Sequence, residues 1–182
     1  VARPLELSEM PRLLDDYRLA AANAKKAGFD GVQLHSANGY LLDQFLRDGT
    51  NFRDDDYGGA VENRIRLTVE VTKILCDVWG AGRVSVRLSP NGESQGCDDS
   101  QPETVFPAVA AALSDLGIGF LELREPGTDG SFGRTDVPKQ SPAIRKVFKQ
   151  ALVLNSDLTA DSGQALLDVD AADAISFGRS FM

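Results

Sequence analysis

Three side chains suited to polarising and protonating a substrate lie within six residues, at His35, Asn38 and Tyr40. A neutral imidazole and a carboxamide can both donate hydrogen bonds to one carbonyl or oxyanion oxygen. A phenol beside them can protonate a developing carbanion as a general acid. Taken singly, His35 is equally well explained as a structural histidine, and Tyr40 as a half-buried core aromatic. Together they predict a catalytic cluster.

A second set of residues is suited to holding an anion. Asn155, Ser156 and Asp157 follow one apolar run, and the pair Gly178-Arg179 follows the next. Backbone N–H groups and a guanidinium fork suit a phosphate dianion. A surface ion pair is the simpler explanation for Arg179 taken alone.

The elements that must position these residues alternate along the chain. Apolar and β-branched runs predict strands at 31–35, 84–88, 119–123, 151–154 and 174–177. Helical spacing predicts helices from an N-cap at Ser8 to residue 27, at about 61–79, at 103–116, at 141–149 and at about 161–169. Such alternation indicates a parallel α/β sheet with right-handed crossovers.

The polar residues stand where these strands end. His35, Arg87, Asn155 and Gly178 each lie at or just after the carboxyl end of a predicted strand. Loops at that end converge on one face in parallel α/β folds, and sites form there. Two architectures fit: a complete doubly wound sheet, or part of an eight-stranded barrel, which typically needs about 250 residues.

Composition restricts the class of protein. The chain has 182 residues with 19 Lys+Arg and 27 Asp+Glu, a net charge of −8, which argues against a nucleic-acid partner. No apolar run reaches the roughly 20 residues of a membrane span, so we expect no membrane partner. His35 is the only histidine, and it lies far in sequence from Cys76 and Cys97, so we expect no metal site. Two cysteines favour a reducing compartment and hence a cytoplasmic location.

A dense polar segment, residues 51–59 followed by Glu62-Asn63-Arg64, lies between the first strand and the next helix. Its composition is that of a solvated acidic loop with a Gly-Gly hinge. We expect it to be structural, tying the loop after the first strand to the following helix.

Four stretches of the chain resemble the Old Yellow Enzyme family of FMN-dependent ene-reductases, which includes proteins similar to N-ethylmaleimide reductase: residues 28–46, 51–66, 86–90 and 172–179. The resemblance implies a parallel (β/α)8 TIM barrel, of which this chain covers about strands 4 to 8. It implies that residues 1–182 are a single partial barrel domain, without the first three strands and the C-terminal tail.

The resemblance also implies a reaction. A reduced nicotinamide, NADPH or NADH, reduces FMN, which passes hydride to the β-carbon of an electron-poor alkene such as an enone, a maleimide or a nitro compound. His35 and Asn38 match the residues that bind the carbonyl or nitro oxygen of this small-molecule substrate. Tyr40 matches the proton donor to the α-carbon.

The remaining matched residues belong to the cofactor. Arg87 matches the residue beside the pyrimidine edge of the flavin, and Gly178 and Arg179 match the FMN phosphate site. Where many members have Gly followed by Asn or Gly in the phosphate loop, this chain has Ser156 and Asp157. Backbone donation survives that change, but an inward-pointing Asp157 would repel a phosphate.

Two alternatives to a flavoenzyme stay open at this point. The chain could be an inactive, truncated half-barrel without bound flavin, or a doubly wound domain for a phosphorylated ligand. In the barrel interpretation we expect the missing N-terminal part, supplied in cis or in trans, to be needed before FMN binds. We also expect an apolar inner face lined by Val32, Leu34, Val86 and Leu121 to be left partly uncovered.

Overall fold

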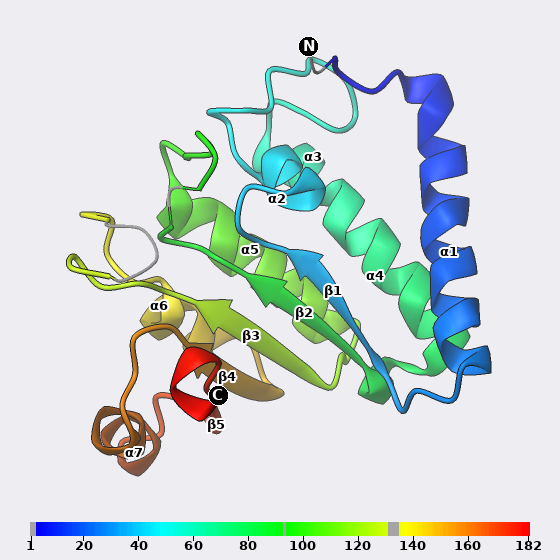
Figure 1. Cartoon of the computed structure of the whole chain (residues 1–182). Helices are drawn as coiled ribbons and strands as arrows, with labels where there is room; N and C mark the ends of the chain where they lie inside the picture. The colour runs from blue at the N-terminus through cyan, green and yellow to red at the C-terminus, as the bar shows by residue number, and fades with distance from the viewer. Residues whose placement is uncertain (1–2, 93, 131–134) are drawn as a thin grey trace.

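The computed structural model describes residues 3–92, 94–130 and 135–182. One parallel sheet runs through it in chain order, β1-β2-β3-β4-β5 (Figure 1). The strands are β1 (Val32–Ser36), β2 (Val84–Leu88), β3 (Phe120–Arg124), β4 (Ala151–Asn155) and β5 (Ala174–Ser176). A doubly wound sheet reverses its strand order at a switch point, and this sheet does not, so the doubly wound alternative is wrong.

Helices connect the successive strands. They are α1 (Met10–Lys26), α2 (Leu41–Leu46), α3 (Val61–Arg64), α4 (Arg66–Trp79), α5 (Pro102–Asp115), α6 (Ser141–Val147) and α7 (Ala160–Asp168). Short 3-10 turns stand at η1 (Leu7–Glu9), η2 (Ala81–Arg83) and η3 (Arg179–Phe181). None of the helices in these described ranges is long and apolar enough to cross a membrane.

The five predicted strands are confirmed to within two residues, and three details of the helices differ. Ser8 is not an N-cap, because it lies inside η1, where Glu6 and Glu9 cap the turn reciprocally. The helix predicted at 61–79 is divided at Ile65 into α3 and α4. The six-residue helix α2, directly after Tyr40, was not predicted.

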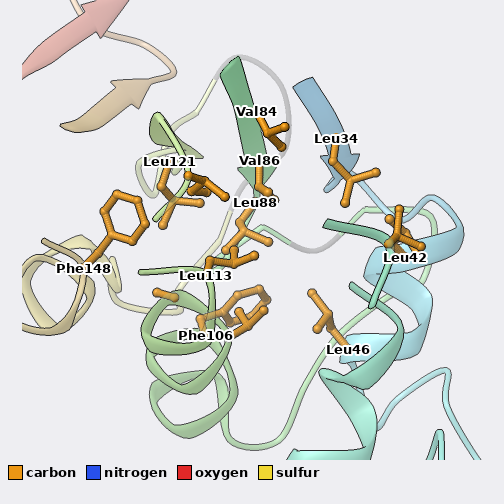
Figure 2. Close-up of a cluster of buried hydrophobic side chains, with 14 of the residues drawn as sticks. Leu34, Leu42, Leu46, Val84, Val86, Leu88, Phe106, Leu113, Leu121 and Phe148 are labelled. Carbon is orange, nitrogen blue, oxygen red and sulfur yellow. The ribbon is translucent and has the colours of Figure 1, made fainter. Parts of the chain in front are cut away.

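One face of the sheet packs against the helices. The register places Leu34, Val86, Leu121 and Leu152 side by side across β1 to β4, and all four are buried. Figure 2 shows three of them, together with Leu88, directed towards side chains of the following helices, among them Phe106 of α5. The expectation that Val32, Leu34, Val86 and Leu121 line a partly uncovered inner face is therefore wrong, because the last three form the core beneath the helices and Val32 packs against it.

The opposite, concave face carries many polar side chains, with Phe120 and Val153 in register among them. Alternation along the strands directs Gln33, His35, Arg87, Glu122 and Asn155 away from the helix-covered core. In Figure 1, α4 and α5 lie behind β1 and β2, and α1 lies outside α4. Every site residue predicted on a strand is thus on the face that the helices do not cover.

The stagger of side chains across this concave face is that of a closed barrel. Gln33 is in register with Phe120, yet it bonds to Glu122, two residues further along β3. Glu122 is in register with Ala174, yet it bonds to Ser176, again two residues further. A climb of one residue per strand gives a shear of about eight over eight strands, as in a (β/α)8 barrel. The sheet is therefore a segment of such a barrel, as the sequence predicted.

Candidate active site

A cavity of about 540 Å³ lies at the carboxyl ends of the strands. Its lining includes seven of the nine site residues predicted from the sequence: Asn38, Arg87, Asn155, Ser156, Asp157, Gly178 and Arg179. Residues from four strand ends, separated by up to about 140 positions, therefore meet at one place, as parallel strand ends should. The two other predicted residues, His35 and Tyr40, are outside this lining and lie close to each other, on either side of Asn38 in sequence.

Arg124, the last residue of β3, also lines the cavity, and the sequence-based prediction missed it. Its side chain is buried, and it runs beneath Gly92, where a Cβ would lie 3.1 Å from Arg124 Nη1. Burial lowers the pKa of this guanidinium, and the charges of Arg87 and Arg179 lower it further, while Asp157 opposes them. The sequence signal was present, since Arg124 follows Glu122 at the two-residue spacing of one strand face.

Arg87 is held by residues on both sides. Its Nη2 donates to Asn155 Oδ1 (2.8 Å), and its Nε lies 3.7 Å from Glu122 Oε1. Asn155 in turn donates from Nδ2 to the Ser176 carbonyl (2.8 Å). This network fixes the guanidinium on the concave face, beside the cavity.

The loop after β4 has a backbone conformation that favours glycine. Ser156 has φ 95° and Asp157 has φ 55°, both in the left-handed region. These are the two positions at which the sequence departs from the family's pattern. The Asp157 side chain is exposed and accepts a hydrogen bond from Ser156 Oγ (3.1 Å). The backbone therefore keeps a glycine-like turn without the glycines.

His35 and Tyr40 lie close together at the end of β1, and Asn38 lies in the turn between them in sequence. His35 is in register with Arg87, and its ring centroid lies 5.5 Å from that of Tyr40. Partial burial of the ring lowers the pKa of His35, and Arg87 lowers it further, while Asp43 and Glu122 oppose them. The imidazole is therefore neutral at pH 7, the state that can donate one hydrogen bond and accept another.

The turn that carries Asn38 is anchored from the buried side of the molecule. Asp43 of α2 accepts a hydrogen bond from the Gly39 backbone N–H (2.8 Å) and another from Arg47 Nε (2.8 Å). Ser89, after β2, donates to Asp43 and accepts from the Asn38 backbone N–H (2.8 Å). The unpredicted helix α2 thus holds the turn of Asn38 and Gly39 in place.

The polar segment after α2 has the structural role expected of it. Asn51 Nδ2 donates to the carbonyls of Phe45 (2.6 Å) and Tyr57 (2.7 Å), which closes the loop. Arg64 is buried, donates to the Leu46 carbonyl (2.8 Å) and forms an ion pair with Asp99. These bonds tie the end of α2 to α3.

The donor set of the cavity fits an anionic, aromatic cofactor such as FMN. Three arginines, Arg87, Arg124 and Arg179, line the cavity, and their positive charge suits an anionic ligand. Asn38 Oδ1 is buried without a hydrogen-bond partner among the described residues, so an acceptor is available to a ligand, whereas Arg87 Nε is directed to Glu122 Oε1, 3.7 Å away. Within the same described ranges, no three His, Cys, Asp or Glu side chains are grouped so as to hold a metal ion.

Comparison with known proteins decides the family. A model of the NADH:flavin oxidoreductase / NADH oxidase family matches residues 1–182. The chain belongs to this family. The resemblance found in the sequence is confirmed, and so are the cofactors of the family, FMN and a nicotinamide reductant.

Solved structures and other relatives agree with this family assignment. The Old Yellow Enzyme homologue of Zymomonas mobilis superposes with a TM-score of 0.98 at 63% identity, over 100% of this chain and 51% of that one. Morphinone reductase in complex with tetrahydroNAD gives 0.91 at 40% identity, over 98% and 47%. A protein of Oryza sativa subsp. japonica named as a 12-oxophytodienoate reductase is 39% identical, over 99% and 58%. The chain thus spans about half the length of the relatives it matches.

Proposed function

We propose that this chain is a single partial barrel domain, residues 1–182, of an FMN-dependent oxidoreductase that reduces activated C=C bonds with NAD(P)H. The observation that carries the proposal is the position of the cavity. An arginine-lined cavity adjoins a neutral histidine, an asparagine and a tyrosine at the carboxyl end of one parallel sheet. These are the groups needed to hold a phosphorylated flavin and to polarise and protonate a substrate.

FMN would be held by the cavity wall. We assign its phosphate to Arg179, Gly178 and the loop Asn155-Ser156-Asp157, since guanidinium and backbone N–H groups bind phosphate well. Arg124 adds a second positive charge beside Arg179 in the lining of the cavity. Arg87 is assigned to the pyrimidine edge, where positive charge favours the reduced, anionic flavin. When bound, FMN supplies hydride transfer from a nicotinamide to an alkene.

The alkene would be activated by the residues at the end of β1. The neutral His35 and Asn38 donate hydrogen bonds to the carbonyl or nitro oxygen of the substrate, which withdraws electrons from the double bond. Tyr40 Oη donates the proton to the α-carbon. The names of the relatives, reductases of 12-oxophytodienoate and of morphinone, support a reductase with a small-molecule substrate.

The rest of the barrel, in cis or in trans, is the expected partner of this chain, because the relatives are about twice as long. The free thiols of Cys76 and Cys97 fit a reducing compartment such as the cytoplasm.

The test uses the complete protein that contains this chain. We expect a purified sample to show a flavin absorbance spectrum and to oxidise NADPH or NADH when given 2-cyclohexenone, N-ethylmaleimide or a nitroalkene. Product analysis should show a saturated C–C bond with the carbonyl or nitro group intact. A protein that binds FMN but reduces none of the three alkenes would contradict the assigned reaction, and one that binds no FMN would contradict the cofactor assignment.

A further inference from the structure

Glu122, in the middle of β3, contacts residues of three other strands on the concave face. It has no role in the proposed reaction. Its Oε2 accepts a hydrogen bond from Gln33 Nε2 of β1 (2.9 Å). Its Oε1 accepts from Ser176 Oγ of β5 (2.8 Å) and lies 3.7 Å from Arg87 Nε. One carboxylate therefore connects β1, β2, β3 and β5.

A carboxylate is costly at this position. The interior of a (β/α)8 barrel is dominated by Val, Ile and Leu, and burying an ionised group carries a large desolvation penalty. Glu122 is only 9% exposed, and Arg87 is the cation paired with it. Gln33 and Ser176 satisfy its oxygens but contribute no charge, so the pairing with Arg87 is what compensates the ionised form.

We propose that Glu122 is a positioning residue of the flavin site: it is the counter-ion that holds Arg87 against the sheet and sets how much positive charge Arg87 presents to the cavity. The inference deepens the proposed function and rests on it, since it takes Arg87 to face the flavin. Glu122 itself lies outside the cavity lining and acts through Arg87.

The charge balance gives the direction of the effect. Positive charge beside the pyrimidine edge stabilises the reduced, anionic flavin more than the oxidised, neutral one. Glu122 offsets part of the Arg87 charge and therefore keeps the reduction potential lower than Arg87 alone would set it. In Glu122→Gln the amide can still accept from Gln33 and donate to Ser176, so the change removes charge while leaving the hydrogen bonds possible.

The same balance reaches His35. The charged groups acting on its imidazole are Arg87, which lowers the pKa of His35, and Asp43 and Glu122, which raise it; the ring of Tyr40 lies 5.5 Å from the imidazole, centroid to centroid. Removing the Glu122 charge should lower the pKa of His35 further. This consequence does not depend on bound flavin.

The experiment compares Glu122→Gln with the wild type and with Glu103→Gln, a matched change at an exposed position of α5. In the complete protein we expect Glu122→Gln to raise the midpoint potential of bound FMN. The ratio of affinities for reduced and oxidised flavin should rise on the order of tenfold, or about 30 mV for a two-electron couple. An NMR titration of the His35 imidazole in flavin-free protein should show a lower pKa. Glu103→Gln should change neither quantity.

Other outcomes are equally decisive. A Glu122→Gln protein with lower thermal stability but unchanged potential and unchanged His35 pKa shows a purely structural residue and overturns the inference. If the wild type binds no FMN, the proposed function fails, and the His35 titration alone decides whether Glu122 is the counter-ion. If Glu122→Gln does not fold, Glu122→Asp, which keeps the charge but shortens the reach to Arg87, should shift the potential. An unchanged potential in Glu122→Asp would then overturn the inference.

Discussion

Tyr40 is more than half exposed, and its ring lies 5.5 Å from that of His35, at the carboxyl end of β1. Among the side chains of this cluster, the phenol is the one suited to protonating carbon. A neutral imidazole and an amide are far weaker acids, and their assigned work is to hold the substrate oxygen. Because different residues polarise and protonate the substrate in this assignment, substitutions of the two kinds of residue should have different effects on the reaction.

We predict that Tyr40→Phe slows alkene reduction selectively. Losing a general acid costs on the order of a hundredfold or more in rate. Reduction of bound FMN by NADPH needs no proton from Tyr40, so that half-reaction should keep its wild-type rate. Stopped-flow spectroscopy of the complete protein separates the two half-reactions. Equal slowing of both would show that Tyr40 is structural.

The arginines of the cavity wall give a prediction about cofactor binding. Arg179→Ala and Arg124→Ala should each weaken FMN binding by about 1.5–3 kcal/mol, because each removes a charge-assisted contact to the phosphate. Arg12→Ala, at an exposed pair on α1, is the matched control and should leave the dissociation constant unchanged. Fluorescence titration of the apoprotein measures all three. FMN affinity unchanged in Arg179→Ala would refute the phosphate assignment.

Most residues of the cavity could be predicted from the sequence, and one was missed. Arg87, Asn155 and Arg179 were found because each follows an apolar run, so their place at a strand end could be inferred. Arg124 follows the predicted third strand just as Asn155 follows the fourth, and the structure adds each residue to the end of its strand. The same rule therefore applied to Arg124, so its place at a strand end was predictable from the sequence.

At the scale of elements, the short helix α2 supports the turn that carries Asn38 through Asp43. We predict that Asp43→Ala lowers the free energy of unfolding by about 3–5 kcal/mol, because it leaves the buried Arg47 guanidinium without its carboxylate. Asp16→Ala, which breaks an exposed pair on α1, should cost less than about 1 kcal/mol. Urea unfolding of the complete protein measures the difference, and equal losses would contradict the anchoring role of Asp43.

The loop after β4 gives a prediction of the opposite sign. Ser156→Gly should stabilise the fold by roughly 0.5–1 kcal/mol, because glycine adopts the φ of 95° without the strain that a Cβ causes. Ser8→Gly, in the 3-10 turn η1 where the backbone is not left-handed, should be neutral or destabilising. Thermal unfolding compares the two variants. Destabilisation by Ser156→Gly would show that its hydroxyl matters more than its backbone.

Helix and strand patterns predicted most of the elements correctly. The expectation of which strand residues face the barrel interior was wrong. The five strands were predictable from short apolar or β-branched segments, some of them alternating with polar residues, whereas α2 has six residues, too few for a helical period to be recognised. Alternation shows which residues of one strand share a face, as Val84 and Val86 do, but it does not show which face the helices cover. Barrel interiors are commonly apolar, and here the interior is the polar face of Arg87 and Glu122.

At the scale of the whole molecule, the strands follow one another in chain order, and their side chains are staggered as in a closed barrel. Within the described part of the chain, β1 and β5 each pair on one side only. Edge strands expose unpaired N–H and C=O groups and can associate with other chains. The concave face, by contrast, carries the polar side chains of Gln33, Arg87 and Glu122, so exposure of this face to solvent should cause little aggregation by itself.

We predict that the 182-residue chain, expressed alone, is not a competent flavoenzyme. It supplies one wall of a cofactor pocket, and an open wall buries far less of a ligand than the roughly 70–90% that a typical pocket covers. Its free β1 and β5 edges should cause self-association, which light scattering on a size-exclusion column would detect. Adding the remaining barrel strands, in cis or as a second polypeptide, should restore FMN binding and turnover. A monodisperse 19.6 kDa monomer that binds FMN stoichiometrically and reduces an enone with NADPH would contradict this prediction, because closure of the barrel would then be unnecessary for the site.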